Sequence, residues 1–156
     1  MTLVRRLTTE QREKLLALPL VGVLTVAAEP GRAPLATPIW HDYRPGGLVV
    51  VLTSPRLRKA RLIAEAGRFA LCVRETEWPN RHVSVEGPVV ETRPVTDADR
   101  LAMARRYLPP EIAAAYVEAT HEEQGGNVSI SMRPQRWNTA DFTDLAERLN
   151  LSPASL

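Results

Sequence analysis

An apolar run turns at once into a basic one in the segment Leu48-Val49-Val50-Val51-Leu52-Thr53-Ser54-Pro55-Arg56-Leu57-Arg58-Lys59-Ala60-Arg61. The apolar half, residues 48–53, is rich in β-branched side chains and predicts a buried strand. Ser54 is a favoured helix N-cap and Pro55 suits a first helical turn, so we predict a helix that begins there. Gly67 is expected to end that helix. The chain therefore passes directly from a buried strand into a basic helix N-terminus.

Four cations crowd the start of this predicted helix: Arg56, Arg58, Lys59 and Arg61. A helix N-terminus carries partial positive charge and unpaired N–H groups, so cations are unfavourable there. A bound phosphate or phosphodiester would offset that cost by accepting the N–H groups and the charged donors, and Thr53 and Ser54 add hydroxyl groups. The segment predicts an anion site. A solvated basic helix face is the alternative that the local sequence leaves open.

Turn residues and hydrophobic periodicity divide the rest of the chain into short elements. Strands are predicted at 20–28, 34–43, 48–53, 68–75, 81–91 and 127–132, with a bulge at Gly87-Pro88. Helices are predicted at 8–18, 54–66, 96–108, 111–123 and 141–149, two of them opened by capping boxes at Thr8 and Thr96. Six strands with short hairpin connections predict a fold that is mainly β with α (α+β), a small antiparallel barrel with peripheral helices.

Composition narrows the function classes without naming one. The chain has 156 residues, 44% of them apolar and 24% charged, which predicts a single globular domain, residues 1–156. A net charge of +2 and only 5% aromatic residues argue against a nucleic-acid binder. The single cysteine, Cys72, excludes an internal disulfide and is expected to pack in the core. Three scattered histidines predict no metal site.

The N-terminal residues and the longest apolar stretch, 15–28, match neither a signal peptide nor a membrane span. We therefore expect a cytoplasmic protein that does not bind membranes.

A second group of candidate residues precedes the basic segment, on the predicted strand 34–43. Proline distorts this strand at position 38, which exposes backbone groups to a flat heterocycle, and Trp40 offers apolar area. The alternative is an ordinary hairpin strand with Trp40 in the core. His41 and His82 could act as an acid or base, but position alone assigns no catalytic role.

Four stretches in this order resemble the pyridoxamine 5′-phosphate oxidase-like, FMN-binding split β-barrel superfamily, whose relatives include flavin and deazaflavin oxidoreductases: Gly22-Val23-Leu24-Thr25-Val26, Pro34-Leu35-Ala36-Thr37-Pro38-Ile39-Trp40, Leu52-Thr53 with Arg58-Lys59-Ala60, and Val83-Ser84-Val85-Glu86-Gly87. The resemblance covers about residues 10–140 and leaves 141–156 as a C-terminal tail. It implies a split β-barrel and a homodimer with two cofactor sites at the subunit interface.

The resemblance also implies which residues bind the cofactor. Arg58 and Lys59 would hold its phosphate, with Leu52 and Thr53 beside them. The preceding strand would contact the ring system through Thr37, Pro38, Ile39 and Trp40, and His82 would approach the cofactor at the opening of the fifth strand.

Two departures from the oxidase itself shape the expected function. Thr37 stands where the oxidase has arginine, and the C-terminal Arg-Leu-His-Asp-Arg segment that reads pyridoxine is missing. Vitamin B6 oxidation is therefore not expected. The predicted function is an FMN-dependent oxidoreductase acting on a small molecule, with a deazaflavin coenzyme of the F-420 type as the alternative cofactor. A non-catalytic carrier of a flavin or tetrapyrrole is the alternative function.

Overall fold

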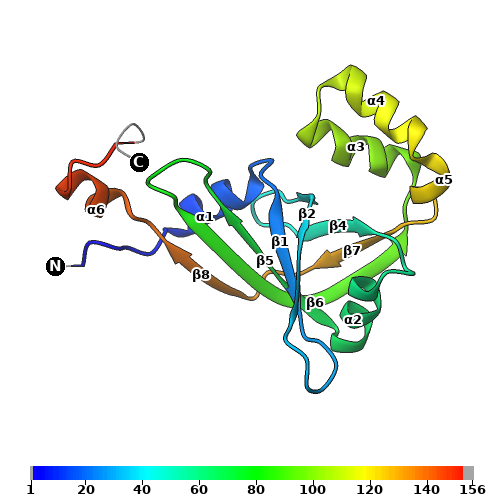
Figure 1. Cartoon of the computed structure of the whole chain (residues 1–156), viewed down its shortest axis with the longest axis horizontal. Coiled ribbons are helices and arrows are strands. Elements are labelled where there is room, and N and C mark those ends of the chain that lie inside the picture. Colours follow the sequence, from blue (N-terminus) through cyan, green and yellow to red (C-terminus); the bar gives the residue numbers. More distant parts are fainter. Residues whose placement is uncertain (1, 153–156) are drawn as a thin grey trace.

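The computed structural model describes residues 2–152 as one curled antiparallel sheet with helices around it (Figure 1). The strands are β1 (Gly22–Val26), β2 (Leu35–Ile39), β3 (His41–Asp42), β4 (Val49–Thr53), β5 (Arg68–Arg74), β6 (His82–Pro94), β7 (Val128–Met132) and β8 (Arg136–Ala140). The helices are α1 (Thr9–Ala17), α2 (Arg58–Ala66), α3 (Asp97–Tyr107), α4 (Pro110–Ala119), α5 (His121–Gln124) and α6 (Thr143–Arg148).

Strand β6 connects the two halves of the sheet. The strand order is β2-β1-β5-β6-β7-β4-β3, and β8 pairs with β6 outside this path. Residues 82–88 of β6 pair with β5, whereas residues 89–94 pair with β7, after a register shift between Val89 and Glu91. One long strand thus belongs to two sheets and turns the corner between them. The predicted bulge is present but lies just beyond Gly87-Pro88.

The two ends of this path are joined by a single residue, because β2 and β3 are consecutive in the chain and only Trp40 separates them. The sheet therefore curls into a half-barrel, which confirms the predicted antiparallel split barrel. The predicted number of six strands is wrong, since the sheet has eight. The strand expected at 34–43 is divided at Trp40, and residues 136–140, for which no strand was predicted, form β8.

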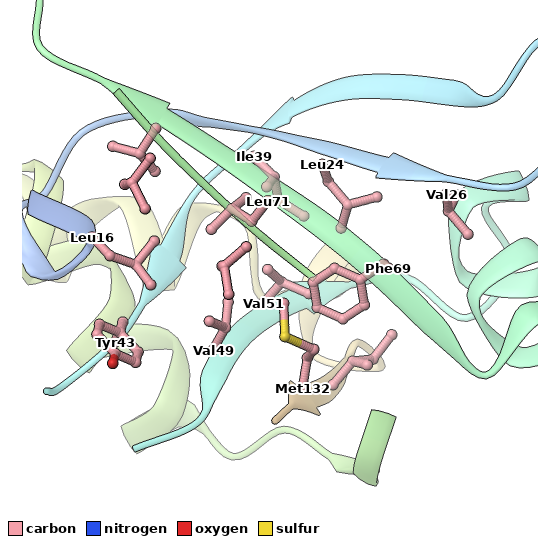
Figure 2. Packing of buried hydrophobic residues seen from close by; sticks show 14 of the residues in the cluster. Leu16, Leu24, Val26, Ile39, Tyr43, Val49, Val51, Phe69, Leu71 and Met132 are labelled. Carbon is pink, nitrogen blue, oxygen red and sulfur yellow. The ribbon is translucent and has the colours of Figure 1, made fainter. Parts of the chain in front are cut away.

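The core fills the concave side of the sheet (Figure 2). Alternate residues of the strands point inward, so that Leu24, Val51 and Leu71 are fully or almost fully buried. Helices α1 and α2 each add a buried pair, Leu15 with Leu16 and Leu62 with Ile63. Burial of a leucine or isoleucine side chain contributes about 1.5–3 kcal/mol, so these helices are held mainly by their apolar faces.

Local signals fix most helix ends. Both predicted capping boxes form, at Thr8 with Gln11 and at Thr96 with Asp99. Gly67 ends α2 with a φ of 69°, a left-handed conformation that favours glycine. The helix predicted at 111–123 is instead two helices, α4 and α5, which meet at Thr120. Helices α3 and α4 form a hairpin at one end of the molecule, and α6 lies at the other (Figure 1).

Cys72 does not pack in the core as expected. It lies on β5 between the buried Leu71 and Val73, so its side chain faces the other side of the sheet and is half-buried. Within residues 2–152, no helix is both long and apolar enough to cross a membrane. The same residues contain no cluster of three or more histidine, cysteine or acidic side chains suited to a metal ion.

Candidate functional site: the basic turn before helix α2

The basic segment forms a turn before it becomes a helix. The Leu57 amide donates to the Ser54 carbonyl oxygen (3.2 Å), and the Arg56 amide donates to the Ser54 hydroxyl (3.3 Å). Helix α2 starts only at Arg58, so the prediction that Ser54 caps it is wrong. Leucine has no side-chain acceptor, so Leu57 at the N-cap leaves the first amide groups of α2 without a side-chain cap.

One acidic residue forms ion pairs with two of the four cations. Glu29, in the turn between β1 and β2, accepts hydrogen bonds from Nε and Nη2 of Arg58 at 3.2 and 2.6 Å. Arg61 Nη2 lies 3.3 Å from the same carboxylate. The hydrogen bonds from Arg58 lower the pKa of Glu29 to about 2, so the carboxylate is charged at neutral pH. The basic segment is therefore neither wholly solvated nor wholly free for a ligand.

Lys59 and Thr53 remain without partners at the same turn. Lys59 is half-buried, has no ion-pair partner within residues 2–152, and has a pKa lowered by its loss of contact with water. Thr53 is only 3% exposed, and its hydroxyl oxygen makes no hydrogen bond to any described residue. Polar groups that are shielded from water normally have partners. A partly buried ammonium, an unpaired hydroxyl and uncapped amides are the donors that a phosphate accepts.

The residues predicted to contact a ring system face different directions. Along β2, Thr37 is half-buried, Pro38 is exposed and Ile39 is buried in the core. Trp40 lies outside the main core cluster, stacked on Tyr107 of α3 with ring centres 4.9 Å apart and planes 5° apart. The local alternative of a core tryptophan is therefore wrong, because α3 rather than the barrel core covers this ring.

Leu52 and Thr53 also face opposite sides, as neighbouring residues of a strand must. Thr53 is buried with Val49 and Val51, whereas Leu52 lines a small cavity together with Trp40. The structure thus brings Leu52 to Trp40 and keeps Thr53 next to the turn that leads into α2.

His41 is fully buried and holds the fold together. Its Nε2 lies 2.7 Å from the Leu16 carbonyl oxygen, and its Nδ1 lies 3.2 Å from the Tyr107 hydroxyl. Burial lowers the pKa of His41, which keeps the ring neutral, donating from Nε2. The ring therefore joins α1, β3 and α3 and is out of reach of a reacting molecule.

His82 lies far from the basic turn within one protomer. It pairs with Arg74 at one end of β5, whereas Glu29, which binds Arg58 of the basic turn, follows the end of β1 that pairs with Ala70 near the other end of β5. Seven residues of β5 separate the two ends, which is roughly 20 Å at 3.3 Å per residue. His82 packs instead near Phe142, with ring centres 6.3 Å apart.

Sequence patterns did not reveal two of the residues that shape these sites. Glu29 was evident only as part of a turn, and its pairing with Arg58 spans 29 positions. Arg100 lies in α3, a helix that the sequence predicts from its capping box, but nothing in the local sequence indicates that this arginine is buried. The one local signal was the excess of positive charge at residues 56–61, which predicted a bound anion and left a solvated basic face as the alternative.

Known structures share this architecture. An F420 reductase is 25% identical, with a TM-score of 0.65 over 81% of this chain and 94% of that one. A FAD-binding protein from Mesorhizobium loti is 20% identical, with a TM-score of 0.63 over 90% of this chain and 99% of that one. A protein from Listeria innocua described as a candidate pyridoxamine 5′-phosphate oxidase is 11% identical, with a TM-score of 0.57 over 84% and 96%. No protein-family model and no curated protein matches this chain.

Proposed function

We propose that this chain, which has the split-barrel fold of the pyridoxamine 5′-phosphate oxidase-like superfamily, is an oxidoreductase that uses FMN or a deazaflavin cofactor. The observation that carries the proposal is the group of unsatisfied donors at the start of α2. Lys59, Thr53 and the uncapped amides would hold the cofactor phosphate there.

Glu29 would compete with a bound phosphate for the guanidinium group of Arg58. A phosphate at the start of α2 would share Arg58 with the Glu29 carboxylate, or would draw it away. Both partners of the ion pair are about one-third exposed, at 28% and 37%, so water solvates either side chain when the pair opens. Lys59 needs no such exchange, and we assign it the larger share of phosphate binding.

The cofactor, when bound, supplies hydride chemistry that the side chains of the site do not provide. The chain's part is to bind the phosphate at α2 and to orient the ring by the polar and apolar groups of β2. The likeness to an F420 reductase and to a FAD-binding protein favours a flavin or deazaflavin over other redox groups. FMN is our first choice, and the deazaflavin coenzyme is the second.

We further propose a homodimer built on the outer face of the sheet. Val23, Pro38 and Cys72 lie side by side on that face, because Val23 pairs with both of the others across neighbouring strands. Val23 is 40% exposed, which is high for an apolar strand residue flanked by apolar neighbours. A second copy on this face would also bring another His82 toward the interface, which is how His82 could serve a cofactor held elsewhere.

Sedimentation of Val23→Asp tests the dimer. The variant is expected to sediment as a monomer. Val90→Asp is the matched control, because Val90 is equally exposed, at 39%, on a different part of β6, and it should leave the dimer intact. Equal sedimentation of wild type and Val23→Asp would overturn this part of the proposal.

Titration with FMN and with riboflavin tests the phosphate site directly, because the two ligands share the ring and differ in the phosphate. FMN should bind roughly ten- to a hundredfold more tightly, the range expected from one charge-assisted hydrogen bond. Lys59→Ala should remove most of that preference. Lys14→Ala is the matched control, since Lys14 is the only other lysine and is exposed beside Glu10.

Wild-type protein loaded with cofactor also distinguishes an enzyme from a non-catalytic carrier. Protein loaded with reduced cofactor should oxidise it faster than free cofactor when a quinone acceptor is added. Tight binding without faster oxidation would instead favour the carrier. If wild type and Lys59→Ala prefer FMN over riboflavin equally, the phosphate is not held at α2.

A further inference from the structure

A small cavity lies between the barrel and the helical hairpin, apart from the basic turn. It has a volume of about 170 Å³ and is lined by Trp40, Leu52, Arg100, Met103, Tyr116, Gln124 and Asn127. Four of these side chains are aromatic or apolar, while Arg100, Gln124 and Asn127 bring polar atoms. A mostly apolar wall with a few polar groups is typical of a ligand site.

Arg100 is the unusual member of this lining. It is only 4% exposed, although arginine is rarely buried without a full set of partners. Its Nη2 donates to the Val117 carbonyl oxygen at 3.0 Å and to the Thr120 hydroxyl at 2.7 Å. Its Nη1 lies 3.2 Å from Asp97, a carboxylate that is itself 66% exposed.

The third guanidinium nitrogen of Arg100, Nε, is buried and has no hydrogen-bond partner within residues 2–152. A buried donor without an acceptor is costly, more so on a charged group. The positive charge is also balanced only by one largely solvated carboxylate. Arg100 lines the cavity, so an anionic acceptor bound there would balance a guanidinium charge that, among the described residues, only Asp97 pairs with.

The size and walls of the cavity restrict what could supply that acceptor. An apolar cavity of about 150 Å³ can take up benzene, so this one is the size of a single ring. Trp40 and Tyr116 stand 5.5 Å apart, with their planes inclined at 46°, and offer aromatic surface to such a ring. Ligand pockets for larger molecules measure roughly 300–1,000 Å³, so a flavin ring system is too large.

We infer that this cavity binds a small monocyclic aromatic carboxylate, with the ring against Trp40 and Tyr116 and the carboxylate on Arg100. Gln124 and Asn127 provide further amide groups for the second carboxylate oxygen or a ring substituent. The inference does not rest on the proposed cofactor site, because the Arg100 cavity is formed by this chain alone and needs no flavin.

Calorimetric titration of the flavin-free protein with benzoate tests the inference, with benzyl alcohol as the neutral probe of the same shape. Benzoate should bind at one site and at least about tenfold more tightly than benzyl alcohol, as a charge-assisted hydrogen bond predicts. Arg100→Met should abolish that preference. Arg105→Met is the matched control, because Arg105 is an exposed residue of the same helix.

Arg100 also holds the end of α4, so its loss could loosen the hairpin. Met103→Trp provides an independent test, because the larger ring narrows the cavity and leaves Arg100 in place. This variant should bind benzoate at least about tenfold more weakly, because the added ring volume displaces the ligand. Equal affinity for both probes, or no saturation by benzoate up to about 10 mM with folded wild-type protein, would overturn the inference. A failure of FMN binding alone would leave it intact.

Discussion

The Tyr107 hydroxyl attaches helix α3 to the barrel beside Arg106, which binds the His41 and Ala17 carbonyl oxygens and Asp42. Removal of this hydroxyl gives a sharp prediction. The hydroxyl accepts a hydrogen bond from the His41 amide at 3.0 Å, and its single proton lies within reach of the Leu20 carbonyl oxygen at 3.1 Å and of His41 Nδ1 at 3.2 Å. Burial raises the pKa of Tyr107, so the hydroxyl stays protonated and able to donate. Tyr107→Phe removes these bonds and keeps the ring that stacks on Trp40.

The expected loss follows from the groups that are left behind. His41 is fully buried, so its amide loses an acceptor where water cannot replace it, at a cost of about 1–3 kcal/mol. The lost bond donated by the hydroxyl adds about 0.5–1.5 kcal/mol. We therefore expect Tyr107→Phe to lower the free energy of unfolding by about 1.5–4.5 kcal/mol.

Equilibrium unfolding in urea measures this loss as a lower midpoint with an unchanged slope. Tyr116→Phe is the matched control. The Tyr116 hydroxyl exchanges hydrogen bonds with the Gln124 side chain, at 3.0 and 3.3 Å, and both residues are half-buried. The control should lose less than about 1 kcal/mol. Equal stability of the two variants would refute the view that the Tyr107 hydroxyl fastens the hairpin.

Three further changes give definite outcomes. Glu29→Gln should strengthen FMN binding, because a neutral amide no longer competes for Arg58; weaker binding on titration would contradict that competition. The pKa of His41 is lower in the folded chain than the usual 6.5, so this residue's contribution to stability is complete above pH 6.5 and is lost as the pH falls through the folded value. The free energy of unfolding of wild type should therefore drop more steeply below pH 6.5 than that of His41→Gln, and parallel curves would refute a buried neutral ring. Gly87→Ala should cost at least about 2 kcal/mol in urea unfolding, because its Cβ would lie 1.7 Å from the carbonyl oxygen of Arg133 in the β7–β8 connection, and wild-type stability would show that this connection moves away without cost.

Local signals in the sequence were sufficient for much of the fold. The capping boxes at Thr8 and Thr96 and the glycine at position 67 act within a few residues, so the pattern alone predicts them. Strand β4 follows in the same way from a continuous run of apolar, β-branched residues, and β7 from apolar alternation. Of these elements, β4 positions the basic turn, because the turn follows it directly and leads into α2.

Features that depend on distant contacts could not be predicted. Ser54 has a side chain suited to an N-cap, but residues 54–57 form a turn and helix α2 begins only at Arg58. Strand β8 forms because residues 136–140 pair with residues 82–86 of β6. The sequence of residues 136–140 does not by itself indicate this pairing. The same holds for Glu29, whose partner Arg58 comes from another element. The excess of charge predicted a bound anion or a solvated face, and it did not reveal that a side chain of the protein would pair with two of the cations.

The central claim is that the start of α2 holds the phosphate of a redox cofactor. A crystal structure of the protein grown with FMN, or with the deazaflavin coenzyme, tests it most directly. The claim predicts phosphate oxygens within about 3 Å of Lys59 Nζ and the Thr53 hydroxyl. A bound cofactor whose phosphate lies away from α2, with Lys59 still unpaired, would contradict it.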